Sequence, residues 1–346
     1  MSAYNFSCYY FTKWVQYGQL QYNEFIVFAF VYVVIMVPAI FLNALILVSI
    51  YRTPALQTPK MTLVSNLAFF DFGVGLVAQP VTIAWMAVEL RATELQETYC
   101  YMSVWFMIVS IAFPAVSFFS VIAIAVDRFL ALYLHLRYHT VVTMKKAFTV
   151  CAFTWVSSII LVTIWLTVGR KDMVLFGLLS NPLIFLFEMI VLGSYFQIFK
   201  ILQKHKRQIQ SVQVTFSRSR SRSSSLDEPV SQNTHPQNLR QYKKSLMSSF
   251  YIYLTFILCY LPLFITMTFS AAVTTEYRIS AYMWKSSCTI LVMNSAINPA
   301  IYCWKMRELR NAVRQTVMWL REMTGLARNE GLSHRHHPAQ LAWSPN

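Results

Sequence analysis

Charged residues are scarce in this chain. Only 12% of its 346 residues are Asp, Glu, Lys or Arg, whereas 56% are hydrophobic and the mean hydropathy is +0.46. A soluble globular domain carries about 25% charged residues. The scarcity of charge therefore excludes an ordinary soluble domain and predicts an integral membrane protein.

Seven long apolar stretches account for this composition. Each can cross a hydrocarbon core of about 30 Å, which takes about 20 residues in a helix. They run over residues 25–50, 61–90, 101–134, 147–168, 175–202, 245–273 and 281–304. The sequence therefore predicts an all-α membrane protein with a seven-transmembrane helix bundle over residues 25–304. Because the number of spans is odd, the two termini should lie on opposite sides.

The net charge of +15 is unevenly distributed along the chain. With the N-terminus outside, few basic residues fall in outer segments, namely Lys13, Arg91, Arg170, Lys171, Arg278 and Lys285. The remaining lysines and arginines lie at inner helix ends, in inner loops or in the tail. This positive-inside bias predicts a multi-pass plasma-membrane protein with an extracellular N-terminus and a cytoplasmic C-terminus, and it requires no nucleic-acid partner.

The predicted extracellular segment, residues 1–24, lacks the basic and then apolar pattern of a signal peptide. We therefore expect the first span to act as its own insertion signal. Asn5-Phe6-Ser7 is an acceptor motif for N-glycosylation, which predicts a glycan on Asn5.

Polar residues interrupt several of the apolar stretches. Asn43 lies in the first, Asp71 in the second, Asp127-Arg128-Phe129 ends the third, and the last closes with Asn294 to Tyr302. Polar groups are costly within a membrane, so they indicate either a water-lined site or a helix that can bend. Asn43 taken alone is explained by an interhelical hydrogen bond.

These residues belong to a set that resembles a known family. The set comprises Asn43, the run from Leu67 to Asp71, Asp127-Arg128-Phe129, Trp155, Cys259-Tyr260-Leu261-Pro262 and Asn298-Pro299-Ala300-Ile301-Tyr302. It resembles the motifs of rhodopsin-like (class A) G-protein-coupled receptors, in the right order and in the expected helices. The resemblance extends from the first helix to Met323 and implies a receptor, not an enzyme.

The resemblance implies an allosteric sodium and water site at the centre of the bundle, with no other cofactor. Its residues would be Asp71, Ser117, Asn294, Ser295 and Asn298. Carboxylate, hydroxyl and amide oxygens are suitable ligands for a hard cation, with Asp71 supplying the charge that faces Na⁺.

The resemblance also implies an activation switch that couples to a heterotrimeric G protein through outward movement of helix six. Its residues would be Asp127, Arg128, Tyr195, Tyr260, Pro262, Asn298, Pro299 and Tyr302. Arg128 would turn toward the G protein, with Tyr195 and Tyr302 settling around it. Pro262 and Pro299 would supply the kinks that let the inner ends of these helices move; the alternative is a static kink filled by packing.

Two departures from the family pattern bear on this switch. Tyr260 stands where the family usually has tryptophan, so a rotamer switch does not transfer directly to it. Tyr242 stands where an acid often holds the arginine, which leaves Asp127 as the main partner of Arg128. We therefore expect appreciable signalling without ligand. The fifth helix also lacks its midpoint proline and has Phe187 there, beside Glu188.

The cysteines depart from the family pattern as well. None lies between Cys151 and Cys259, although the family usually joins helix three to the loop after helix four. We expect a disulfide between Cys8 and Cys100, with Cys288 as an alternative partner. The short loop at 169–174, the missing proline and Arg307 to Arg310 resemble melanocortin, adenosine and lipid receptors weakly. The acids that melanocortin receptors use are absent, since Val81, Ser103 and Met107 hold those positions.

The absence of two kinds of residue excludes two classes of extracellular ligand. No acid lies between Tyr101 and Ala125 to bind an amine, and no lysine lies between Ser286 and Trp304 to bind retinal. By analogy the pocket would be lined by Trp85, Met107, Ser110, Tyr260, Phe264, Met267 and Val292. Such a lining suits a lipid-like ligand, an apolar small molecule or a peptide end, while helix packing alone explains many of these side chains.

The inner side carries regulatory signals. Basic residues follow helix five at 200–207 and precede helix six at 243–244, which fits either G-protein contact or membrane anchoring. Between them we expect a disordered third intracellular loop over about 208–238. Its serines are expected phosphorylation sites for receptor kinases, with arrestin as a partner: Ser221, Ser223, Ser224 and Ser225.

After the last span, residues 305–323 are predicted to form an amphipathic helix that lies on membrane lipids, followed by a cytoplasmic tail at 324–346. Apolar residues recur there at helical spacing against a basic face. The alternative function is a secondary transporter or another non-signalling membrane protein. Transporters typically contain internal repeats and enzymes need convergent catalytic groups, and the sequence contains neither pattern.

Overall fold

The computed structural model describes residues 21–134, 137–169, 173–220, 250–268, 277–323 and 325. All regular structure in these ranges is helical, as the composition predicts. The elements are α2 (Tyr22–Arg52), η2 (Pro54–Leu56), α3 (Pro59–Gly73), η3 (Val74–Ala78), α4 (Gln79–Glu89), α5 (Gln96–Leu134), α6 (Tyr138–Val141), α7 (Met144–Ile164), η5 (Trp165–Gly169), α8 (Met173–Arg220), the helix Phe250–Thr268, α10 (Tyr277–Lys305) and α11 (Arg307–Met323).

Six helical segments in the described ranges are long and apolar enough to cross a membrane. They are Tyr22–Arg52, Pro59–Glu89, Gln96–Ala131, Met144–Val168, Leu175–Gln197 and Phe250–Thr268. The seventh expected span is α10, which has 29 residues and several polar side chains. Large apolar side chains such as Phe30 and Phe153 point outward, at 67% and 65% exposed, whereas Asn43 and Asp71 are fully buried. This outward apolar surface and polar interior suit a protein surrounded by lipid.

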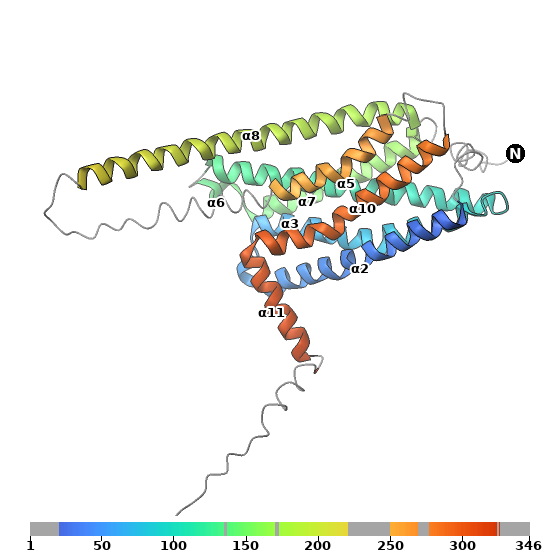
Figure 1. The fold of residues 1–346 in the computed structure, drawn as a ribbon, viewed down its shortest axis with the longest axis horizontal. Helices are drawn as coiled ribbons and strands as arrows, with labels where there is room; N and C mark the ends of the chain where they lie inside the picture. Colours follow the sequence, from blue (N-terminus) through green and yellow to red (C-terminus); the bar gives the residue numbers. More distant parts are fainter. Residues whose placement is uncertain are drawn as a thin grey trace, which may run out of the picture.

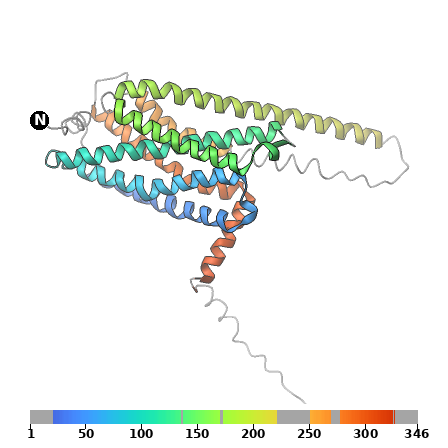
Figure 2. The ribbon, with the colours of Figure 1, turned by 180° about the vertical axis from the view of Figure 1, so that it is seen from behind.

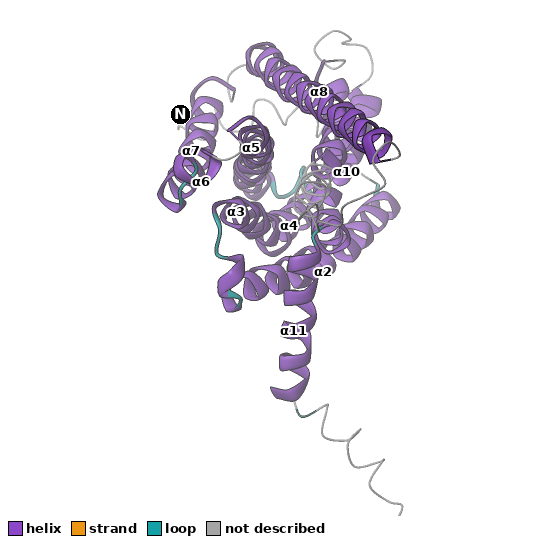
Figure 3. Cartoon of the chain, turned by 90° about the vertical axis from the view of Figure 1, so that its left-hand side faces the viewer, coloured by secondary structure: helices purple, strands orange, loops and turns teal. Residues whose placement is uncertain are grey.

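The helices run roughly side by side and form one elongated bundle (Figure 1). Seen from behind, α7 lies alongside α5 (Figure 2), and the two helices pack against each other. Along the bundle axis the helices appear nearly end-on, and α11 projects to one side (Figure 3). We call the end where α2 begins the Cys100 end, and the end where α11 lies the Arg128 end.

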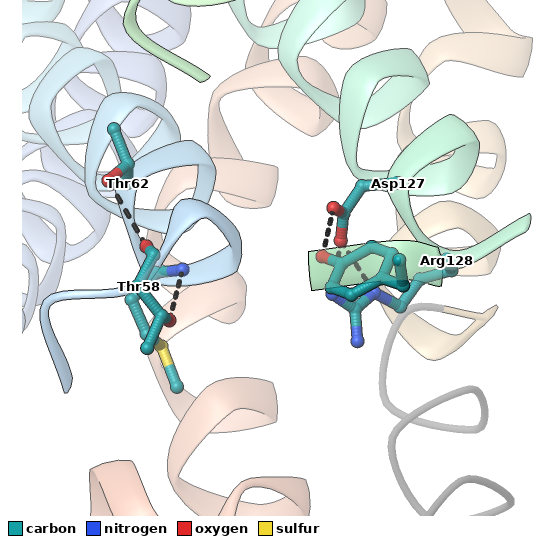
Figure 4. A network of polar contacts seen from close by, with 6 residues as sticks. Thr58, Thr62, Asp127 and Arg128 are labelled. Atoms are coloured by element: carbon teal, nitrogen blue, oxygen red, sulfur yellow. Dashed lines mark hydrogen bonds and ion pairs between the residues drawn. The ribbon is translucent and has the colours of Figure 1, made fainter. Parts of the chain in front are cut away.

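The second span consists of three helical segments in sequence. Thr58 caps α3, because its hydroxyl accepts a hydrogen bond from the Met61 amide at 3.4 Å (Figure 4). Val74–Ala78 then widens to a π-helix, with the Gln79 amide bonded to the Val74 carbonyl. Pro80 follows directly and has no N–H to donate to Leu76, which explains the change in hydrogen-bond register.

Two glycines in this span permit close helix contact. A Cβ atom on Gly75 would lie 2.7 Å from Cγ1 of Ile40 and 3.2 Å from the Ile40 backbone nitrogen. A Cβ on Gly73 would clash with the Phe113 ring. Gly75 therefore lets the second span approach α2, and Gly73 lets it approach the Phe113 ring of α5, more closely than a residue with a Cβ could.

A polar network joins the second, third and fourth spans. Asn66 donates to the Ser120 hydroxyl at 2.8 Å and to the Thr154 hydroxyl at 3.3 Å, and its carbonyl accepts from the Trp155 indole at 2.9 Å. This contact places the expected family tryptophan, Trp155, against α3. The network fixes which faces of α3, α5 and α7 meet, whereas apolar packing alone would allow each helix to rotate about its axis.

The third intracellular loop begins later than the sequence predicts. We expected disorder from about residue 208, but α8 continues as one helix to Arg220. Residues 208–220 contain neither proline nor glycine, so nothing in them ends a helix that the membrane span has already started. Residues 221–249, with the four candidate phosphorylation serines and Tyr242, lie outside the described residues.

The expected amphipathic helix is present as α11, Arg307–Met323. Leu309 is buried, Val313 and Val317 are partly buried, and α11 packs against α2. The Arg52 guanidinium lies 3.5 Å from the centroid of the Trp319 ring, which fastens the far part of α11 to the end of α2.

We predict that Gly75→Ala lowers the apparent Tm of the purified protein by several degrees. The added methyl group meets the backbone of α2, and overpacking of this kind costs about 1–3 kcal/mol. Gly193→Ala is the matched control, because nothing lies within 4 Å of a Cβ at that helical position. Equal Tm values for the two variants would contradict the close contact.

Candidate functional site

Asp71 lies at the centre of a buried polar site in the middle of the bundle. Its Oδ2 atom accepts a hydrogen bond from the Asn298 side chain on α10 at 2.8 Å. Both residues are fully buried. The contact therefore joins the second span to the seventh deep within the protein.

The other expected sodium-site residues are also buried. Ser117 on α5 is 3% exposed, and Asn294 and Ser295 on α10 are 2% and 4% exposed. Asn43 donates to the Ser295 carbonyl at 2.9 Å, so α2 also contacts this part of α10.

Several oxygens in this region have no hydrogen-bond partner among the described residues. They are Asp71 Oδ1, Asn43 Oδ1, Asn294 Oδ1, Asn298 Oδ1 and the Tyr302 hydroxyl. Buried polar atoms normally find a partner, in protein or in bound water or ions. One carboxylate with neutral oxygens is a donor set that a monovalent hard cation with water would satisfy. Within the described ranges no three His, Cys, Asp or Glu side chains form a metal cluster.

A second polar group lies at the Arg128 end. Arg128 forms an ion pair with Asp127, in which its Nε donates to Oδ2 at 2.9 Å (Figure 4). The other carboxylate oxygen of Asp127 accepts from the Tyr138 hydroxyl of α6 at 2.6 Å. Asp127 and Arg128 are 5% and 6% exposed. Sequence reasoning had missed Tyr138, because this tyrosine belongs to no distinctive motif.

The two tyrosines expected in the switch are both buried. Tyr195 stacks on Tyr253 with ring centroids 5.1 Å apart, which packs α8 against the helix Phe250–Thr268. Tyr302 is fully buried in α10. Pro299 lies inside α10, three residues before Tyr302, and Pro262 lies inside the helix Phe250–Thr268.

Tyr260 forms a direct bond between two helices. Its hydroxyl donates to the Pro114 carbonyl of α5 at 2.9 Å, and its ring stacks on Phe256 at 3.8 Å between centroids. A tryptophan could not donate from the same atom position. Tyr260 therefore joins the helix Phe250–Thr268 to α5 by a contact specific to tyrosine.

A small cavity of about 70 Å³ lies toward the Cys100 end. Four of the seven expected pocket residues line it: Met107, Ser110, Met267 and Val292. Trp85, Tyr260 and Phe264 do not line it; Trp85 and Tyr260 pack against other side chains. Ligand pockets typically enclose about 300–1,000 Å³, so a drug-sized ligand would have to displace lining side chains.

The cysteines partly resolve the disulfide question. Cys100 is disulfide-bonded, whereas Cys288 is a free thiol and is therefore not its partner. Cys8 and the glycosylation candidate Asn5 lie outside the described residues, so the pairing of Cys8 with Cys100 stays a prediction.

An ion pair that sequence reasoning missed lies near the cavity. Lys285 on α10 contacts Glu89 on α4 at 2.8 Å, and both side chains are buried. Glu89 lies within the second apolar stretch, so its position could have marked it as an intramembrane acid beside Asp71 and Glu188. Lys285 was counted among the outer basic residues, but the structure places it inside the bundle.

Comparison with known proteins identifies the family. Residues 42–302 match the family described as 7 transmembrane receptor (rhodopsin family). The chain belongs to this family. The receptor is 23% identical to human melanocortin receptor 3 over 278 residues, which is 79% of this chain and 80% of that protein. It is 25% identical to the dog adenosine receptor A2a over 320 residues, 82% of this chain and 70% of that protein.

The family and these relatives confirm a rhodopsin-like receptor and a multi-pass membrane protein that signals as this family does. The two relatives are a melanocortin and an adenosine receptor, two of the groups that the short loop and the missing proline weakly resemble. The matched range includes Asp71, Arg128, Tyr260 and Asn298, so the buried polar contacts lie within the family region of the receptor.

We predict that Tyr260→Phe raises ligand-independent G-protein activation about two- to tenfold. Losing one hydrogen bond costs about 0.5–1.5 kcal/mol, and about 1.4 kcal/mol changes an equilibrium tenfold. The loss should free the helix Phe250–Thr268 from α5. A G-protein sensor in cells, corrected for surface expression, measures the change.

Tyr101→Phe is the control for Tyr260→Phe, because Tyr101 is 62% exposed. An unchanged basal signal in Tyr260→Phe would show that the bond to Pro114 does not restrain the helix.

Proposed function

We propose that this receptor passes the binding of an extracellular ligand at the Cys100 end to a heterotrimeric G protein at the Arg128 end. Its N-terminus lies outside the plasma membrane and its C-terminus lies in the cytoplasm. The coupling step is outward movement of the helix Phe250–Thr268. The observation that carries the proposal is the buried contact of Asp71 with Asn298, because it lies between the two ends and joins two spans.

The restraint at the Arg128 end supports this direction of signalling. Arg128 is paired within the bundle with Asp127 and is therefore withheld from a cytoplasmic partner. Releasing that pair exposes a planar cation with five hydrogen-bond donors, which suits the carbonyl and carboxylate groups of an inserted protein segment.

A small number of polar contacts keeps the receptor in its resting conformation. Asp127 is held by Arg128 and Tyr138. The moving helix is held by single neutral hydrogen bonds, from Tyr260 to α5, from Tyr253 to α8 and between Thr266 and α10. A single bond of this kind contributes about 0.5–1.5 kcal/mol. We therefore propose appreciable basal activity.

Sodium is the proposed allosteric ion of the central site. Asp71 supplies the negative charge, and Ser117, Asn294, Ser295 and Asn298 supply neutral oxygens. The unpaired oxygens of Asp71, Asn294 and Asn298 support this assignment. An ion bound in the resting receptor and released on activation stabilises the resting state by mass action.

The cavity lining supports the ligand class that we propose. The cavity is mostly apolar, with Ser110, Thr82 and Tyr32 as its hydroxyl-bearing residues. A lipid-like ligand, an apolar small molecule or the apolar end of a peptide is the chemistry that suits such a lining. Arrestin and receptor kinases are proposed further partners, through Ser221, Ser223, Ser224 and Ser225.

We predict that sodium lowers basal signalling in the wild type and that Asp71→Asn removes this effect. Asparagine retains the size and a hydrogen-bond acceptor but loses the charge that attracts the cation. Basal G-protein activation is measured in membranes with NaCl or with equimolar KCl. Sodium sensitivity that survives in Asp71→Asn would place the ion elsewhere.

We predict that the wild-type receptor activates at least one G protein above mock-transfected cells, and that Arg128→Ala reduces this signal to the mock level. The variant lacks the guanidinium that the G protein would contact. A panel of G-protein activation sensors measures both, with surface expression confirmed for each. A wild-type signal no higher than mock across the panel would overturn the basal activity, and persistent uptake of a solute into vesicles would favour a transporter.

A further inference from the structure

The Cys100 end contains a buried ion pair that the signalling scheme does not use. Lys285 Nζ lies 2.8 Å from Glu89 Oε1, with the two side chains 3% and 0% exposed. Lys285 comes from α10 and Glu89 from the last residue of α4, so the pair joins the seventh span to the second. It lies at the opposite end of the bundle from Asp127 and Arg128.

An aromatic ring completes the surroundings of the ammonium group. The Trp85 ring centroid lies 5.7 Å from Lys285 Nζ, within the range at which a ring face attracts a cation. Trp85 lies one helical turn before Glu89 on α4, so both groups come from one face of one helix.

The position of Trp85 is fixed on several sides. Its ring stacks on Phe106 at 4.3 Å and on Tyr99 at 6.3 Å between centroids. Its indole N–H donates to the Ser103 hydroxyl at 3.0 Å, and Ser103 in turn donates to the Tyr99 carbonyl at 2.7 Å. These contacts with α5 hold the ring beside Lys285 independently of the lysine's own contact with it.

Fold stability alone does not account for this arrangement. Burying two charges costs more solvation than their attraction usually returns, and apolar residues of similar size would often be at least as stable. A carboxylate beside a fixed aromatic face is, however, the chemistry by which proteins bind alkylammonium groups. The arrangement therefore resembles a binding site, and the group in it belongs to the chain.

We propose that Glu89 and Trp85 form an alkylammonium-binding site whose resident ligand is the side chain of Lys285. The occupied site clamps α10 to α4 at the Cys100 end. External amines do not enter it in the wild type, because the lysine fills it. Removing the lysine side chain should therefore leave a vacant site for a small primary ammonium ion.

The clamp also borders the cavity. Trp284 and Cys288, one residue before and three after Lys285, both line that cavity. A ligand that displaces Trp284 would thus move Lys285, and α10 continues from there to Asn294, Asn298 and Tyr302. Only this effect on signalling rests on the proposed function; the ammonium site itself does not.

The test removes the lysine side chain by mutation and supplies the missing atoms as a small amine in solution. Lys285→Ala lacks the three carbons and the ammonium group that n-propylammonium supplies. We expect millimolar n-propylammonium to raise the apparent Tm of the purified Lys285→Ala receptor by several degrees and to leave the wild type unchanged. The neutral 1-propanol should have no such effect.

The control for Lys285→Ala is the double variant Lys285→Ala with Glu89→Gln, in which n-propylammonium should lose its effect. No Tm shift in Lys285→Ala, or an equal shift in the double variant, would overturn the site. A Tm shift without any change in basal G-protein activation would support the site and overturn its control of signalling.

A second set of variants decides the matter if Lys285→Ala does not fold. Glu89→Gln should lower the Tm of the wild type, because it leaves the ammonium without its counter-charge. The same change should raise the Tm of Lys285→Met, where Glu89 is the uncompensated charge. Effects of the same sign in both backgrounds would overturn the pairing on which the site depends.

Discussion

The arrangement of the bundle depends on one constraint, which the hydrogen bond between Asp71 and Asn298 illustrates: a polar group within the membrane must find its partner inside the protein. Lipid is as apolar as Leu or Phe, so apolar side chains do not determine which face of a helix turns inward. Polar side chains do, because hydrocarbon offers them no partner. Asp71, Asn298 and Asn43 therefore orient the second, seventh and first spans toward one another. The Asn66 network does the same for the third and fourth spans.

The same constraint places a charged pair at each end of the receptor. Asp127 and Arg128 are neighbours within α5, so their pair can open without separating two helices. Glu89 and Lys285 come from α4 and α10, so their pair cannot open unless those helices or their side chains move. Between the two ends, α10 runs from Lys285 to Tyr302 as one element that contains Pro299. A helix held at one end and carrying a proline near the other is suited to relay a displacement.

Some parts of the site were predictable from the residues and others were not. Asp71, Asn298, Asp127 and Arg128 were predictable because each is a costly group at a recognisable spacing. The pairing of Glu89 with Lys285 was not, since the residues lie 196 positions apart and neither belongs to a motif. The extent of α8 was misjudged for another reason: a composition rich in Ser and Arg indicates disorder, yet a helix already nucleated in the membrane continued to Arg220.

The sequence by itself determined the solvent, the number of spans and the family, because hydropathy, charge asymmetry and motif order are properties of the chain alone. It also identified which polar groups need an explanation. Only the tertiary structure decided which groups meet: that Tyr260 donates to Pro114, that Tyr138 donates to Asp127, and that Lys285 pairs with Glu89 beside the Trp85 ring. The physical reason is that hydropathy gives the free-energy cost of burying each group by itself, without reference to its partner. The partner that offsets the cost comes from another helix, whose rotation and depth are set by the packing of the whole bundle.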